Sequence, residues 1–139
     1  MKNKSKLKKV REERAQMPKE PSEWLYLNPE EVGLRSIYEI FGQETPWRAE
    51  LWEEAGVLEI GIPEAGSVDM ERMDADLGDE EGNAYLEKHQ IKTVFAVTIV
   101  PEDYEKARMV MVEIMKSKGG FFCGDTEDFQ PEIRLSEQK

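Results

Sequence analysis

The clearest pattern of hydrophobic positions lies in the second half of the chain. Residues 91–100 are apolar on both faces of an extended strand, which is typical of a central strand in a sheet that is covered on both sides. Pro101-Glu102-Asp103 opens a helix that runs to Lys118, because proline and acidic residues suit the first helical turn and the glycine pair 119–120 can end it. We expect residues 121–123 to return as a short strand beside residues 91–100, which completes a β-α-β crossover.

The helix over 102–118 has apolar residues on more than one of its faces. Residues 109–112 are four consecutive apolar side chains, so something besides the sheet should cover this helix. The candidates are N-terminal helices or a second copy of the chain, and the sequence therefore predicts a homodimer as one way to complete the core. The residues expected to face the core are Tyr104, Ala107, Met111, Ile114 and Met115.

Two shorter runs in the middle of the chain alternate between apolar and polar residues. Residues 57–62 and 67–73 each have period two and are joined by a loop that contains Gly66, which predicts an antiparallel β-hairpin. An acidic connection follows, and a short helix is expected from Glu80 to His89.

The N-terminal third carries helix signals. Asn28-Pro29-Glu30-Glu31 combines a capping side chain, a proline and two acids, and predicts a helix that ends near Gly42. Residues 46–55 predict a second helix that starts at Thr45-Pro46 and ends at Gly56, although the same residues could instead be a strand that enters a hairpin through Glu54-Ala55-Gly56.

Together these elements predict an α+β fold. Its small mixed sheet would combine the β-hairpin with the β-α-β unit and carry additional N-terminal helices, and ferredoxin-like wiring is compatible with this order. We divide the chain into a basic N-terminal arm, residues 1–20, and a single acidic α+β domain with a polar C-terminal tail, residues 21–139.

Charge is unevenly distributed along the 139 residues, whose formal net charge is −11 at pH 7. The arm holds eight basic and three acidic side chains, a net charge of +5, while the remaining 119 residues hold 11 basic and 27 acidic ones, a net charge of −16. Such a body repels phosphate backbones, so nucleic acid could bind only through residues 2–14. The arm could instead be solvated, lie on an acidic body or contact an anionic membrane.

Several classes of protein are excluded or disfavoured. No apolar stretch approaches the ~20 residues that span a bilayer, so we expect no transmembrane segment. The basic start is followed by more charge, which disfavours a secretory signal. One cysteine, Cys123, excludes an internal disulfide and fits a reduced, cytoplasmic setting.

An acidic run is the most distinctive candidate for binding. Its members within thirteen positions are Asp69, Glu71, Asp74, Asp76, Asp79, Glu80 and Glu81. The segment 74–79 resembles a calcium loop superficially but lacks the glycine and glutamate positions of an EF-hand. Asp74, Asp76 and Asp79 are therefore only weak metal candidates, and a face for a basic partner or a solvated loop are the other interpretations.

Motifs for catalysis are missing. Cys123 follows two phenylalanines and precedes Asp125, a setting that predicts a buried thiol and not an activated nucleophile. His89 is the single histidine and suits a helix end. We therefore expect no catalytic residues and no cofactor, and favour a protein that is not an enzyme.

Aromatic residues concentrate between positions 24 and 52. Most should pack in the core, and Trp47, in the first turn of the expected second helix, is the best candidate for an exposed anchor. With Asp69, Glu71, Asp74, Asp76 and Asp79 it forms the expected partner-binding set. The sequence thus favours a non-catalytic acidic protein-interaction module, of the inhibitor, antitoxin-like or adaptor type, with a basic partner. The alternative is a small-ligand or divalent-metal-binding protein, with or without hydrolytic activity, that uses carboxylates near Asp69–Asp79.

Overall fold

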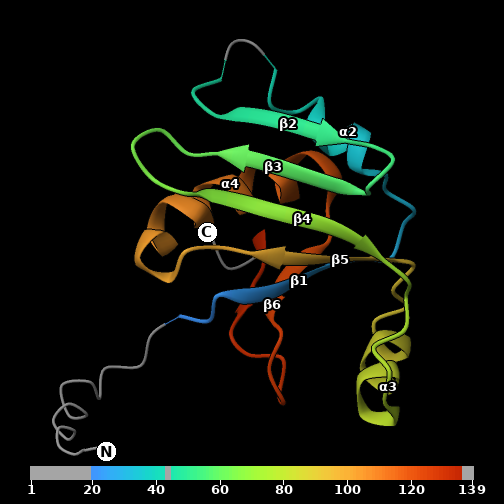
Figure 1. Cartoon of the computed structure of the whole chain (residues 1–139). Coiled ribbons are helices and arrows are strands. Elements are labelled where there is room, and N and C mark those ends of the chain that lie inside the picture. Colours follow the sequence, from blue (N-terminus) through green and yellow to red (C-terminus); the bar gives the residue numbers. More distant parts are fainter. Residues whose placement is uncertain (1–19, 43–44, 136–139) are drawn as a thin grey trace, which may run out of the picture.

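The computed structural model describes residues 20–42 and 45–135. The basic arm, apart from Glu20, lies outside them. In chain order the elements are β1 (Glu23–Asn28), α2 (Leu34–Tyr38), β2 (Arg48–Trp52), β3 (Val57–Gly61), β4 (Ser67–Met73), α3 (Glu80–Lys88), β5 (Thr93–Thr98), the 3-10 turn η2 (Pro101–Asp103), α4 (Tyr104–Lys118), β6 (Phe121–Gly124) and β7 (Glu132–Ile133) (Figure 1).

The described strands form one sheet with the order β2-β3-β4-β5-β1-β6-β7. Every neighbouring pair is antiparallel, so the fold is α+β as predicted, but the expected mixed sheet is wrong. The predicted crossover exists as β5-α4-β6, yet β6 pairs with β1, which lies between β5 and β6. This insertion of β1 and the strand order also differ from ferredoxin-like wiring.

The hairpin β3–β4, the helix α3, the central strand β5 and the helix α4 confirm the corresponding predictions. The helix expected over residues 46–55 is wrong, and the segment takes the alternative strand form, since β2 pairs with β3 across the turn at 53–56. The expected additional N-terminal helices are not found among the described residues. Between residues 28 and 42 only the five-residue α2 forms, and its N-cap residue Gly33 has no side-chain cap.

Asn28 explains why the predicted helix does not start there. Its carbonyl oxygen Oδ1 accepts a hydrogen bond from the Glu30 amide at 2.8 Å, which makes a turn at the end of β1. Its Nδ2 donates to Tyr26 Oη at 2.8 Å and to the Lys118 carbonyl at 2.9 Å. The buried amide therefore ties β1 to the last turn of α4. The turn does not continue as a helix because the Thr93 hydroxyl of β5 donates to the Glu30 carbonyl and accepts from the Val32 amide.

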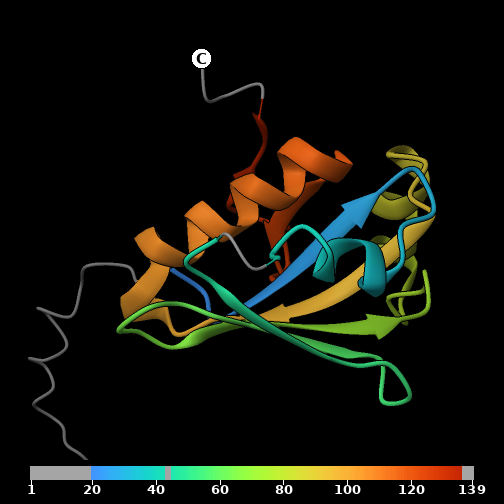
Figure 2. The same ribbon diagram turned by 90° about the horizontal axis from the view of Figure 1, so that it is seen from above.

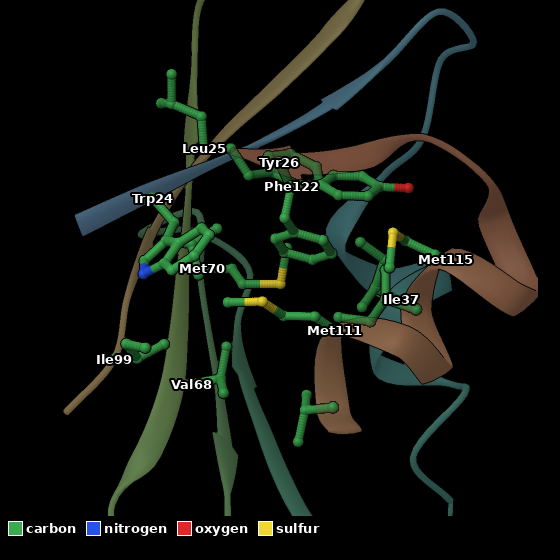
Figure 3. Close-up of a cluster of buried hydrophobic side chains, with 14 of the residues drawn as sticks. Trp24, Leu25, Tyr26, Ile37, Val68, Met70, Ile99, Met111, Met115 and Phe122 are labelled. Carbon is green, nitrogen blue, oxygen red and sulfur yellow. The ribbon is translucent and has the colours of Figure 1, made fainter. Parts of the chain in front are cut away.

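The main core lies between one face of the sheet and the helices α2 and α4, which lie on the same side (Figure 2). Residues of β1, β4 and β6 such as Tyr26, Met70 and Phe122 point toward Met111 and Met115 of α4 (Figure 3). The predicted core residues of α4 are buried except Tyr104, which is half-buried and stacks on Trp24 at 5.9 Å between ring centroids.

The opposite face of the sheet is covered over only part of its width. On β6, Phe121 contacts the His89 ring at the end of α3, and Tyr85 of α3 stacks on Phe129 with centroids 4.1 Å apart. Over β2, β3 and β4 no described helix covers this face, and in Figure 1 the three strands lie in front of α2 and α4. This uncovered part of the sheet contains the candidate site.

Candidate interaction surface on the open half of the sheet

Three carboxylates lie in one row across β2, β3 and β4. Glu50 pairs with Glu59, and Glu59 pairs with Asp69 in the sheet register. Side chains at directly paired positions share a face, with Cβ atoms about 4.5–5.5 Å apart. The neighbouring row on the same face consists of Trp52, Val57 and Glu71. We call these six residues the acidic sheet face.

The alternating sequence of the hairpin fixes this orientation. Leu58 and Ile60 of β3 and Val68 and Met70 of β4 have no exposed surface and pack toward the core. Because a slip of one residue would move all four into solvent, burial locks the register. The intervening polar residues must then point to the uncovered face.

The carboxylates of the acidic sheet face form no ion pair within the described residues, although exposed Arg48 lies in the next row on the same face, beside Glu50. Among residues 20–42 and 45–135, no ion pair involves Glu50, Glu59, Asp69 or Glu71. One local hydrogen bond is present, from Ser67 Oγ to Asp69 Oδ1 at 2.7 Å. Like charges placed opposite one another destabilise a sheet, so this face lowers stability and attracts cations or basic groups.

An exposed tryptophan borders the carboxylates, but it is not the predicted one. Trp52 is 47 % exposed. Trp47 is half-buried, and its ring packs edge-on against Phe41 with centroids 5.6 Å apart. The expectation of an exposed Trp47 is therefore wrong, because residues 48–52 form a strand and not a helix. Alternation along this strand sends Glu50 and Trp52 outward, while Trp47 packs beside α2.

Trp47 instead lines a separate open groove of about 700 Å³. Its lining includes the aromatic side chains of Tyr38, Phe41 and Trp47, together with Pro46 and Arg48. The structure thus separates Trp47 from Asp69 and Glu71, which were predicted to act with it.

Two of the three acidic residues in the β4–α3 loop, Asp76 and Asp79, accept local hydrogen bonds. Asp76 Oδ1 accepts from Asn83 Nδ2 at 3.0 Å and from the Gly78 amide at 2.9 Å, and these bonds hold the pKa of Asp76 below its usual value. Asp79 Oδ1 accepts from the Gly82 amide at 2.7 Å and caps α3. Asp74 is exposed. In the part of the chain that the structure describes, no three potential ligands converge on a metal position.

A second polar cluster forms where α3 meets β6 and β7. Tyr85 Oη donates to Glu132 Oε2 at 2.8 Å, and Arg134 Nε donates to Glu132 Oε1 at 2.9 Å. The Arg134 bond is the main reason that the pKa of Glu132 is lowered. Burial, reinforced by the bond to Glu132, raises the pKa of Tyr85. Sequence reasoning missed this cluster because Tyr85 of α3 and Glu132 of β7 are 47 positions apart and meet only through the fold.

Cys123 belongs to the same region and is buried, as predicted. Burial raises the pKa of its thiol to about 12, so the sulfur is protonated near neutral pH and is a poor nucleophile. His89 packs against Tyr85 with ring centroids 4.6 Å apart. The arrangement satisfies buried polar groups and offers no activated nucleophile.

Comparisons with protein-family models, with curated proteins and with solved structures find no match to this chain. Among the described residues, no helix has the length and apolar character needed to cross a bilayer.

Proposed function

We propose that the chain is a protein-interaction module that binds a partner with a basic surface through the acidic sheet face. The observation that carries this proposal is the row Glu50–Glu59–Asp69, three directly paired carboxylates without an ion pair among the described residues. A basic partner would neutralise the row on binding and relieve its internal repulsion.

Trp52 supports the same surface. Its large, half-exposed ring lies in the row next to the carboxylates and supplies apolar contact area that an acidic patch alone lacks. Tryptophan is enriched among the residues that contribute most to binding energy at interfaces. The expected partner therefore combines Lys or Arg side chains with an apolar position that covers Trp52.

Two matched variants test the surface. The face variant carries E50Q, E59Q and D69N. The control variant carries E87Q, E105Q and E127Q, three exposed acids outside the acidic sheet face. Both lose three negative charges, so a difference between them reports the position of the charges and not the net charge.

The experiment is capture of proteins from the source cell extract on immobilised full-length chain, followed by direct binding of the captured protein after purification. We expect the wild type and the control variant to retain the same basic protein and to release it as salt rises to about 0.5 M. The face variant should lose at least tenfold in affinity, and W52A several-fold. Equal binding by the face variant would refute the proposal.

A further inference from the structure

The row of carboxylates extends across the sheet to the start of β1, where the basic arm joins the body. Glu23, the first residue of β1, pairs with Thr98, and Thr98 pairs with Asp69. Glu23, Thr98, Asp69, Glu59 and Glu50 thus lie in one line across five strands. Residues 1–19 are attached only a few positions before Glu23.

Distance allows this arm to cover the whole row. Neighbouring strands are about 4.8 Å apart, so the line from β1 to β2 measures roughly 19 Å. An extended chain of 19 residues reaches roughly 60 Å. Residues 1–19 contain eight basic and two acidic side chains, which complements the four carboxylates of the acidic sheet face.

A competing acidic region near the attachment point is less suitable. Burial is the main cause of the raised pKa of Tyr104, but Glu20 also contributes, so the chain enters the body near the start of α4. Asp103 Oδ2 there already accepts a hydrogen bond from the Gly66 amide at 2.9 Å. The positive end of the α4 dipole also repels basic side chains. On the acidic sheet face Asp69 accepts one hydrogen bond from Ser67, but the other three carboxylates accept none among the described residues, and no described helix covers them.

We propose that residues 1–19 bind the acidic sheet face of the same molecule, and that a basic partner must displace them to bind. The second half of this proposal rests on the proposed function, whereas the first half does not. Tethering gives a segment of this length a local concentration in the millimolar range. Weak electrostatic contacts are therefore enough to occupy the face at low salt.

The arm can be located with a spin label. In full-length S5C protein the spin label reacts at the introduced cysteine, because Cys123 is buried and its thiol pKa is raised. In NMR spectra of this protein the spin label broadens the amide signals of residues close to it. At about 20 mM salt we expect the amide signals of Glu50, Glu59 and Asp69 to lose at least half their intensity, and to recover at about 0.5 M salt. Amides of α3 should keep their intensity.

Two controls make this measurement decisive. The face variant in the S5C background should lose the broadening, and the control variant should keep it. In the second control, spin-labelled protein at natural isotope abundance is mixed with ¹⁵N-labelled protein that carries no spin label. Here the amide signals should stay unchanged, because an arm that binds its own molecule does not reach the other one. Absence of broadening on β2–β4, broadening centred elsewhere, or broadening in the mixed sample would each overturn binding within one molecule.

Competition is tested with K6Q/K8Q/K9Q/R11Q in the full chain. If the arm covers the face, this variant should bind the purified partner roughly three- to tenfold more tightly than the wild type at low salt. Unchanged or weaker binding would refute displacement. The spin-label result requires no partner, so failure of the proposed function and failure of arm binding are separate outcomes.

Discussion

The thiol of Cys123 lies in β6 without exposed surface. Burial is the largest cause of its raised pKa, about 12, and a hydrogen bond with Tyr85 offsets only part of the increase. We predict that Cys123 reacts with a disulfide reagent at pH 8 at least about a hundredfold more slowly in the native protein than in guanidinium, because the thiolate is the reactive form. A colorimetric thiol assay measures both rates. Complete reaction within minutes under native conditions would contradict this burial.

His89 links stability to pH. Its pKa is lowered mainly by burial and then by Arg134 and Lys88, while Glu132 acts in the opposite direction. The unfolded chain therefore takes up the proton more readily than the folded protein. Stability from this group is complete above the unfolded pKa of about 6.5 and is lost as pH falls toward the lowered folded value.

The variant H89Q should flatten the dependence of the melting temperature on pH between 7 and 5. Thermal unfolding at fixed ionic strength measures it. Glu132 also has a lowered pKa, but its stabilisation is lost only below about pH 4.3. The effects of His89 and Glu132 on stability therefore fall in different pH ranges. An unchanged slope in H89Q would exclude His89 as the cause.

At the scale of the strands, Glu59 is the centre of the repulsion. It pairs with Glu50 on one side and with Asp69 on the other. We predict that E59Q raises the melting temperature by about 2–5 °C at low salt, since opposed like charges destabilise a strand pair. The increase should vanish near 0.5 M salt. E87Q, on an exposed face of α3, serves as the control. Destabilisation by E59Q would show that the carboxylate has a favourable contact in the sheet.

Elements with a strong local signal could be predicted from the sequence. Residues 93–98 and 104–118 have the composition and boundary residues of a strand and a helix, and they form β5 and α4. The position of β1 could not be predicted, because it depends on Tyr26 pairing with both Phe95 and Phe122. Neither partner is near Tyr26 in the sequence. The helix predicted to start at Asn28 was wrong because an asparagine side chain suits both a helix cap and a turn.

Only part of the acidic sheet face could be predicted, because some of its members are distant from one another in the sequence. Asp69 and Glu71 belong to a visible acidic run, whereas Glu50 and Glu59 become their neighbours only through the pairing of three strands. Trp52 is exposed in place of Trp47 because this segment is a strand and not a helix. In the expected helix Trp47 would lie in an exposed first turn, whereas in a strand alternate residues such as Glu50 and Trp52 point outward. The prediction of a second copy over α4 stays a prediction, and Met109 of α4 is 59 % exposed.

At the scale of the whole molecule, salt has two opposing effects on stability. The residues after position 20 carry a net charge of −16, so added salt should raise the melting temperature by screening their mutual repulsion. If the arm binds the folded body, salt also weakens that contact and removes the stabilisation that binding provides. The melting temperature of the wild type should therefore rise less with salt than that of K6Q/K8Q/K9Q/R11Q does.

Thermal unfolding from 20 to 500 mM salt measures both curves. We expect them to differ most at low salt, where the wild type is more stable, and to converge at high salt. Parallel curves would mean that the arm contributes nothing to the folded state, and that the acidic sheet face is open to its partner at every ionic strength.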